Sequence, residues 1–333
     1  MTHLTEWLSR KLSAPPTRAN LDAHIDRALR KTLDHAAKNG RHYSKYLQNI
    51  DIYSYHNIKE LLKSLPFSYP AELRDAPLNF LCVPPHEVLR VVTIPTSGTT
   101  GNPKRVYFSQ EELESTADFF NYGMRNIARA GGRVMIFMRG GSPDGSAVPG
   151  GVCDILTRGL ARFGAEGIAY GEVTDADAAR RALIASGADC AVGIASQLAQ
   201  IARLPGEQPE LKSALLSADN IPPETVTELE QRWGCEVFSH FGMTETAFGG
   251  AVDCAAHAGM HIREPDMLFE IIDPATGENL PDGERGELVL TTLTRRVMPL
   301  VRYRTGDISE IIPGECPCGC ALKRLGHVDG RET

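Results

Sequence analysis

Apolar and polar positions alternate in blocks between residues 133 and 238, and the blocks predict helices and strands in turn. Apolar residues that recur every three or four positions predict helices, and short apolar runs between turn residues predict strands. The predicted helices are 151–163, 175–186, 196–202 and 222–233, and the predicted strands are 133–138, 167–170, 190–194, 211–216 and 235–238. This alternation is typical of a layered α/β domain with a largely parallel sheet.

The segments on either side of this region have different patterns. Toward the N-terminus we expect helices over 21–39 and 58–65, strands over 88–94 and 106–108, and a helix from the capping box of Ser109 and Glu112 to about residue 130. Beyond residue 267, Asp-Pro and Pro-Asp-Gly turns separate predicted strands at 268–272, 286–292, 300–303 and 307–312. We therefore divide the chain into an N-terminal helical region over 1–85, an α/β core over 86–266 and a smaller β-rich subdomain over 267–330.

Composition and charge exclude several classes of protein. The 333 residues carry a formal net charge of −7 with no long run of one sign, which argues against general affinity for nucleic acid or an anionic membrane. No apolar stretch approaches the length of a membrane span. Residues 1–12 include Glu6, Arg10 and Lys11, where a signal peptide needs a continuous apolar block. We expect a cytoplasmic protein with no nucleic-acid or membrane partner.

The densest chemical motif is the run Thr96-Ser97-Gly98-Thr99-Thr100-Gly101-Asn102-Pro103-Lys104, which directly follows an apolar strand. Glycines let a backbone approach closely, and exposed amides, hydroxyls and a lysine bind phosphate oxygens. A Walker loop would have a Ser or Thr after the lysine and a wider glycine spacing, and neither is present. The alternative is an ordinary surface loop, but the density of the motif favours a polyphosphate site.

Further motifs follow in a fixed order. Ser239-His240-Phe241-Gly242-Met243-Thr244-Glu245-Thr246 comes after a predicted strand, Tyr303-Arg304-Thr305-Gly306-Asp307 ends another, and Gly330-Arg331 lies near the C-terminus. With the loop at 96–104, their identity and order resemble the adenylate-forming superfamily of acyl-CoA synthetases, and within it the phenylacetate–CoA ligase family. Local matches at 65–67, 259–261, 291–294 and 298–304 extend the resemblance over essentially the whole chain.

The resemblance implies a site for ATP and Mg²⁺. The β- and γ-phosphates would be held by Ser97, Gly98, Thr99, Thr100, Gly101 and Lys104. Thr244 would contact the α-phosphate, and Glu245 would coordinate Mg²⁺, a hard cation that binds carboxylates. Asp307 would accept hydrogen bonds from the ribose hydroxyls, and Arg331 would lie near the ribose or the phosphate. The adenine would stack on Phe241, next to Gly242.

Several of these assignments depend on the complete set of motifs. Ser217-Ala218-Asp219 occupies the place of the family's adenine-side Gly-Ala-Glu segment, from which two of its three residues differ. A lone glutamate on a loop is usually solvated, and a lone aspartate after glycine usually belongs to a turn. The roles of Lys104, Glu245 and Asp307 therefore depend on the ordered set, and Tyr303 is expected to be a packing residue.

The implied chemistry is activation of a carboxylic acid. The carboxylate would attack the α-phosphate of ATP to give an acyl-adenylate and pyrophosphate, with the protein contributing mainly positioning and charge neutralisation. A thiol, usually that of coenzyme A, would then take the acyl group; a carrier-protein thiol or an amine is the alternative acceptor. We expect an aryl or arylacetic acid under 137–151, with 239–243 as a second wall. In that wall His240 is either a base or a neutral loop histidine.

The eight cysteines fall into two groups. In a reducing compartment none should form a disulfide, and four lie among apolar neighbours as core residues do: Cys82, Cys153, Cys190 and Cys235. Cys254, His261, Cys316 and Cys318 resemble the zinc site of part of the phenylacetate–CoA ligase family, a closed tetrahedral set of ligands. His257 and Cys320 are rival ligands, and a set of free thiols is the alternative to a metal site.

Family members continue beyond the position of Thr333 into a small C-terminal lid domain, which carries a lysine used in adenylation and is absent from this sequence. The leading hypothesis is an AMP-forming acid–thiol ligase. The second is a lidless domain that binds nucleotide or acyl-adenylate with little turnover, as a sensor or as the partner of a separate lid domain. The third is a zinc-organised interaction module. A homodimer is compatible with all three.

Overall fold

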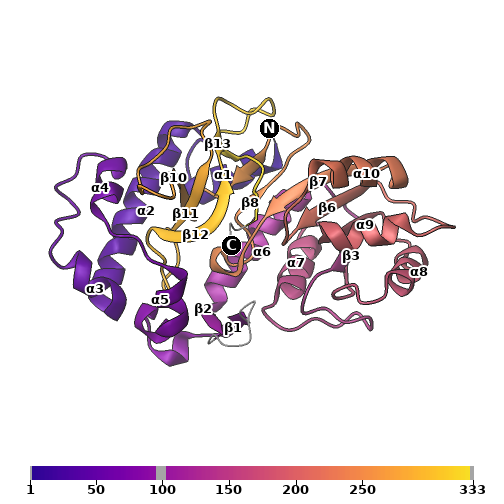
Figure 1. The fold of residues 1–333 in the computed structure, drawn as a ribbon, viewed down its shortest axis with the longest axis horizontal. Coiled ribbons are helices and arrows are strands. Elements are labelled where there is room, and N and C mark those ends of the chain that lie inside the picture. The colour runs from indigo at the N-terminus through magenta and orange to yellow at the C-terminus, as the bar shows by residue number, and fades with distance from the viewer. Residues whose placement is uncertain (1, 95–102, 331–333) are drawn as a thin grey trace.

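The structure is a computed structural model that describes residues 2–94 and 103–330, and two β-sheets organise most of it (Figure 1). The N-terminal helices are α1 (His3–Leu12), α2 (Arg18–Asn39), α3 (Arg41–Leu47), α4 (Ile58–Ser64), α5 (Pro70–Asp75) and the 3₁₀ turns η1 (Pro77–Phe80) and η2 (Pro85–Glu87). The predicted hairpin follows as β1 (Arg90–Ile94) paired antiparallel with β2 (Lys104–Phe108). None of the helices in the described residues is both long and apolar enough to cross a bilayer.

The larger sheet has nine strands and contains all the strands of the predicted alternating region. Its parallel part consists of β3 (Arg133–Phe137), β4 (Glu166–Ala169), β5 (Cys190–Ile194), β6 (Ser213–Ser217) and β7 (Glu236–Phe241), in the order β7-β6-β5-β3-β4. Beyond β7 it is extended antiparallel by four short strands: β8 (Ala251–Val252), β9 (Met260–Ile262), β14 (Arg324–Leu325) and β13 (Ile311–Ile312). The predicted α/β class with a largely parallel sheet is confirmed.

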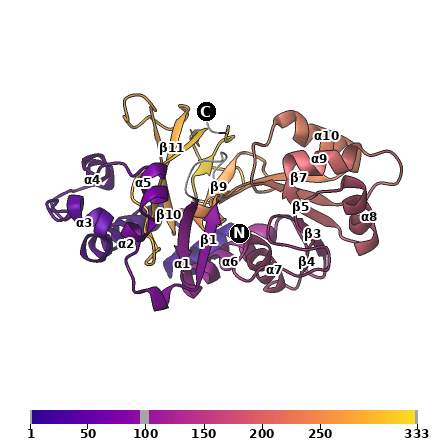
Figure 2. The ribbon, with the colours of Figure 1, turned by 60° about the horizontal axis from the view of Figure 1, so that its bottom comes forward.

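Helices cover both faces of this sheet, because its strands are apolar on both sides (Figure 2). Val134 and Ile136 of β3 pack in one hydrophobic cluster with α6 (Gln110–Met124) and α7 (Val152–Ala161). Met135 and Phe137, which alternate with them, pack with α8 (Ala176–Ser186), α9 (Ala195–Arg203) and α10 (Pro223–Trp233). The two-residue repeat of a strand thus places a central sheet between two helical layers.

The smaller sheet is antiparallel and consists of β10 (Met267–Ile272), β11 (Gly286–Thr292) and β12 (Tyr303–Ser309). It is joined to the N-terminal helices and the segment after them by hydrogen bonds. The hydroxyl of Thr32 on α2 donates to the carbonyl oxygen of Leu293 at 2.7 Å. The backbone N–H of Ser68 donates to the carbonyl oxygen of Arg302 at 3.0 Å. The predicted β-rich region is therefore divided, since β13 and β14 pair in the larger sheet.

Three predicted elements differ from the observed ones. The strand predicted over 307–312 is broken at Glu310, between β12 and β13. The strand predicted over 300–303 does not form, because Arg302 adopts a left-handed φ of 45° and its N–H donates to the hydroxyl of Thr291, so β12 begins only at Tyr303. The helix predicted from the capping box begins as expected but ends at Met124. The strands β8, β9, β13 and β14 were not predicted, because two or three residues are too short for a periodic pattern.

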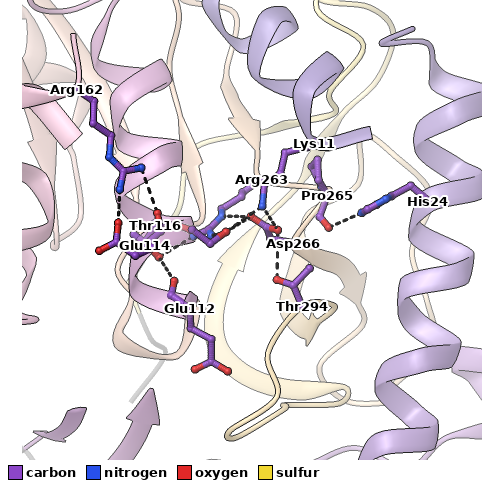
Figure 3. Close-up of polar contacts among 12 residues, drawn as sticks. Lys11, His24, Glu112, Glu114, Thr116, Arg162, Arg263, Pro265, Asp266 and Thr294 are labelled. Carbon is purple, nitrogen blue, oxygen red and sulfur yellow. Dashed lines mark hydrogen bonds and ion pairs between the residues drawn. The ribbon is translucent and has the colours of Figure 1, made fainter. Parts of the chain in front are cut away.

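Helix α1 is fastened to the body of the molecule by a buried cluster of charges around Asp266 (Figure 3). Nζ of Lys11 lies 2.7 Å from Oδ1 of Asp266, and Nε of Arg263 lies 2.7 Å from its Oδ2. The hydroxyls of Ser115 and Thr294 donate to the same carboxylate. Burial by itself raises the pKa of Asp266, but Lys11 and Arg263 outweigh burial and hold that pKa well below its usual range.

We predict that Asp266→Asn lowers the free energy of unfolding by about 3 kcal/mol or more at pH 7, because it leaves the buried Arg263 and the partly buried Lys11 without their carboxylate. The folded-state pKa of Asp266 lies below its unfolded value of about 3.9. Its contribution is therefore complete above that value and is lost as the pH falls through it toward the folded pKa.

Urea titrations at pH 7 and between pH 5 and 3 measure both effects. The wild type should lose more stability than Asp266→Asn over the acid range. The control is Asp282→Asn. The exposed carboxylate of Asp282 pairs with Lys323 at the surface, so its removal should change the free energy of unfolding little. Equal acid dependence in wild type and Asp266→Asn would contradict the prediction.

Candidate active site

Two of the predicted site residues, Lys104 and Glu245, meet in a buried ion pair. Lys104 begins β2, and Glu245 lies in the 3₁₀ turn η3 (Thr244–Thr246). Nζ of Lys104 pairs with Oε1 of Glu245, and their side chains are 11% and 2% exposed. The hydroxyl of Tyr303, at the start of β12, lies 3.1 Å from the same Oε1 and 3.3 Å from Nζ. Tyr303, expected to be a packing residue, is thus also a hydrogen-bonding member of the site.

The residues on either side of Glu245 fix the backbone conformation of η3. A Cβ on Gly242 would lie 2.1 Å from the carbonyl oxygen of Phe248, so only glycine fits that position. The N–H of Met243 donates to the hydroxyl of Thr246 at 3.1 Å, and the same hydroxyl donates back to the carbonyl oxygen of Met243 at 2.9 Å. These contacts close η3 and direct the carboxylate of Glu245 toward Lys104.

A buried arginine that the sequence analysis missed, Arg295, donates a hydrogen bond to the backbone of this turn. Nη1 of Arg295 donates to the carbonyl oxygen of Glu245 at 2.7 Å, and Nη2 donates to that of Tyr107 at 3.0 Å. The guanidinium carbon lies 4.5 Å from the ring centroid of Phe108. Burial lowers the pKa of Arg295. Arg295 therefore links η3 to β2, the two elements that supply the ion pair.

The residues predicted to border the adenine lie at the carboxyl ends of neighbouring parallel strands, where open α/β sheets bind ligands. Ser217 ends β6 and Phe241 ends β7, which pair in parallel. Ala218 has a left-handed φ of 67°, and the carboxylate of Asp219 accepts from the N–H of Asn220. Asp307 lies in β12, where its N–H donates to the hydroxyl of Thr305 at 3.0 Å.

The remaining predicted nucleotide ligands cannot be placed in this site. Ser97, Gly98, Thr99, Thr100, Gly101 and Arg331 lie outside the described residues. Pro103 and Lys104 are the described members of the glycine-rich motif, and Lys104 is the first residue of β2. A cavity of about 370 Å³ lies on the side of η3 that faces Arg295 and the start of α6. Two ion pairs lie along it, Arg263–Asp266 and Arg296–Glu87.

His240 is buried one residue before Phe241. Its Nδ1 lies 2.8 Å from the hydroxyl oxygen of Ser217, and its Nε2 has no hydrogen-bond partner among the described residues. Burial lowers the pKa of His240 to about 4, so its ring is neutral at neutral pH. His240 lies on β7 and not in a loop. Because a base is also neutral before it takes up a proton, this state leaves both alternatives of the sequence analysis open.

Three cysteines and one histidine gather at a second place, on the short strands of the larger sheet. The ligand atoms of Cys254, His261, Cys316 and Cys318 all lie within 4.8 Å of one another. Sγ of Cys254 is 3.8 Å from Sγ of Cys316, and Sγ of Cys318 is 3.2 Å from Nε2 of His261. Nδ1 of His261 faces the carbonyl oxygen of Leu322 at 3.3 Å, which leaves Nε2 to face the thiols.

The two rival ligands have other surroundings. Nδ1 of His257 contacts Asp253, and its Nε2 contacts Glu236, each at 2.9 Å. Cys320 is buried, and burial raises the pKa of its thiol to about 11. Neither residue belongs to the group of mutually close ligand atoms found in the described part of the chain.

Comparisons with known proteins show which family the chain is similar to. The family model described as AMP-binding enzyme matches residues 75–294. The phenylacetate-coenzyme A ligase of Thermus thermophilus is 32% identical over 82% of this chain and 61% of its own length. The Pseudomonas putida phenylacetate-coenzyme A ligase is 31% identical over 97% of this chain and 74% of its own length. The chain thus spans about three fifths of the first of these relatives and about three quarters of the second.

Solved structures share the fold. A 2-hydroxyisobutyryl-CoA ligase in complex with 2-HIB-AMP and CoA, in an open conformation, superposes with a TM-score of 0.81 at 21% identity. The superposition covers 95% of this chain and 70% of that one. The same ligase in its thioesterification state gives the same TM-score at 22% identity.

We predict that Lys104 and Glu245 are energetically coupled in the folded protein. Lys104→Met and Glu245→Gln should each lower the free energy of unfolding by about 3 kcal/mol, because each leaves a buried charge without its partner. The double variant should lose at least ~1 kcal/mol less than the sum of the two. Urea denaturation of the four proteins at pH 7 measures this cycle, and additive losses would contradict it.

Proposed function

Since the chain belongs to the AMP-binding enzyme family, as a relative of the phenylacetate–CoA ligases, we propose that it activates a carboxylic acid with ATP and transfers the acyl group to coenzyme A. The observation that carries the proposal is the buried cluster of Lys104, Glu245 and Tyr303 at the carboxyl edge of the parallel sheet. The acid is proposed to be aryl or arylacetic, in line with the names of the curated relatives.

The ion pair suits a metal–phosphate ligand because it presents both charges that such a ligand needs. Mg²⁺ binds carboxylate and phosphate oxygens, and a lysine ammonium binds phosphate as a point charge. Glu245 would hold Mg²⁺, which supplies charge neutralisation to the phosphates, and Lys104 would contact the β- and γ-phosphates. Each residue would exchange one buried partner of opposite charge for another, so binding would not require a new uncompensated charge.

The remaining proposed contacts with the nucleotide come from residues on or just after β6, β7 and β12. Phe241 would stack on adenine, and Ala218 and Asp219 would border it after the turn that ends β6. Asp307 would accept hydrogen bonds from the ribose hydroxyls, and Thr244 would contact the α-phosphate. Ser97, Gly98, Thr99, Thr100, Gly101 and Arg331 remain proposed phosphate and ribose ligands.

The reaction would proceed in two displacements. A carboxylate oxygen of the acid attacks the α-phosphorus, the bond to the bridging oxygen of pyrophosphate breaks, and an acyl-adenylate forms. The coenzyme A sulfur then attacks the acyl carbon, and AMP leaves with the electron pair of the broken C–O bond. The chain's contribution to the first step is to orient the α-phosphate and to balance charge at Lys104, which are electrostatic and entropic effects.

Exchange of radiolabelled pyrophosphate into ATP, with a panel of carboxylic acids, tests the first displacement. We expect acid-dependent exchange, and we expect Glu245→Gln to lower it at least ~100-fold, since a preorganised charge is removed from the phosphate site. The control is Glu228→Gln on α10, whose partly exposed carboxylate pairs with Arg203 and Arg232. Nucleotide binding without exchange would instead favour a binding domain with little turnover.

We further propose that Cys254, His261, Cys316 and Cys318 hold a structural Zn²⁺ ion. Three thiolates and one imidazole form a closed tetrahedral set with no open position. The fit is supported by the mutual proximity of the four ligand atoms and by the contact of Nδ1 of His261 with Leu322, the kind of second contact that orients a ligating imidazole. The ion would cross-link β8 and β9 to the loop between β13 and β14.

Metal analysis of the purified protein tests the zinc site. We expect about one zinc per chain, as a closed four-ligand site requires, and a marked loss of zinc and of thermal stability in Cys316→Ser. Cys320→Ser is the matched control, because it removes a neighbouring thiol outside the ligand set and should keep the metal. Native protein without zinc would contradict the proposal, as would equal zinc loss in both variants.

A further inference from the structure

A small apolar cavity lies between the parallel sheet and the helices of one face. Its walls are mainly hydrophobic and come from α6, α7 and the strands: Phe120, Met124, Leu156, Val192, Leu215 and Val252. Two polar residues also line it, Ser217 at the end of β6 and His240 on β7. In an apolar cavity such groups fix the orientation of a ligand.

His240 differs from the other residues that line the cavity, because one of its ring nitrogens is buried without a hydrogen-bond partner among the described residues. Nε2 of His240 has no hydrogen-bond partner among the described residues, although the side chain is only 7% exposed. An unsatisfied buried polar group costs stability, and such groups in folded proteins call for a specific explanation. A ligand that completes the hydrogen bond is one such explanation.

The contact with Ser217 determines what the unused atom offers. Among the described residues, the hydroxyl of Ser217 has one hydrogen-bond partner, Nδ1 of His240 at 2.8 Å. A hydroxyl hydrogen in this buried place therefore donates to Nδ1, because the opposite arrangement would leave it without an acceptor. The neutral ring then carries its own hydrogen on Nε2. The cavity thus presents one N–H donor against apolar walls.

The place of the cavity indicates which part of a substrate would enter it. Ser217 immediately precedes Ala218, and His240 immediately precedes Phe241, the residues proposed to border the adenine. The cavity therefore adjoins the nucleotide end of the proposed site, where the activated acyl group must lie. Its volume is about 30 Å³, whereas a cavity that takes benzene has roughly 150 Å³. It has room for a hydroxyl, keto or methoxy group and its attached carbon, but not for a whole ring.

We propose that the acid activated by this protein carries an oxygen acceptor in its acyl group, and that Nε2–H of His240 donates a hydrogen bond to that oxygen. The substrate class is hydroxy-, keto- or alkoxy-substituted carboxylic acids, and His240 is a specificity-determining residue. The inference rests on the proposed acid activation and adds to it the recognition of one substituent. A site built to bond an oxygen discriminates against the analogue that lacks it, because its buried donor is then left unpaired.

Binding of acyl-sulfamoyladenosines, stable mimics of acyl-adenylates, tests this without requiring turnover. The probes are two matched pairs: 2-methylpropanoyl against 2-hydroxy-2-methylpropanoyl, and phenylacetyl against 4-hydroxyphenylacetyl. Calorimetry with the full chain should show tighter binding of the oxygenated member of at least one pair, by about 10-fold or more. His240→Leu should abolish that preference. His240→Gln, which restores an N–H donor, should recover part of the preference.

The outcomes separate this inference from the proposed function. Equal binding of both members of both pairs by the wild type would overturn the role of His240 and leave acid activation intact. A preference that persists unchanged in His240→Leu would overturn it in the same way. If neither the four mimics nor Mg·ATP bind, the proposed function fails and this inference fails with it. Because the wild-type comparison needs no variant, poor folding of His240→Leu would not prevent the test.

Discussion

The buried pair of Lys104 and Glu245 ties together three parts of the chain that are far apart in sequence. Charges are costly to remove from water, and they persist inside a protein when each has a partner and further hydrogen bonds. Here the hairpin supplies the cation, η3 supplies the anion, and the small sheet supplies the hydroxyl of Tyr303. Three segments distant in sequence must therefore be in register for the pair to be satisfied, so the site and the fold depend on each other.

Arg295 shows how this dependence reaches beyond the pair itself. It donates to the backbone carbonyl oxygens of Glu245 and Tyr107, one on each side of the ion pair, and it comes from the loop after β11. The cluster around Asp266 fastens α1 nearby with the same kind of chemistry. Conformation in this part of the molecule is thus held largely by buried, directional polar contacts, while the parallel sheet is held by apolar packing on both faces.

The sequence predicted the parts of the fold that rest on local periodicity. The alternating region from 133 to 238 and the capping box of Ser109 were confirmed, and Lys104 and Glu245 were expected in one site from the order of the motifs. The hydroxyl of Tyr303, the guanidinium of Arg295 and the unused nitrogen of His240 were not foreseen. Their roles come from residues far away along the chain, and no local pattern encodes such contacts. The left-handed Arg302 was missed for the same reason.

The passage of the chain from one sheet to the other has a mechanical consequence. β12 ends at Ser309 in the small sheet, and β13 begins at Ile311 in the large one, so a single residue, Glu310, spans the two. Glu310 is itself held, since its carbonyl oxygen accepts from the N–H of Gly326. Such a short tether leaves the sheets little freedom to swing apart. A ligand that bridges them would therefore find its walls already assembled and would lose less affinity to ordering them.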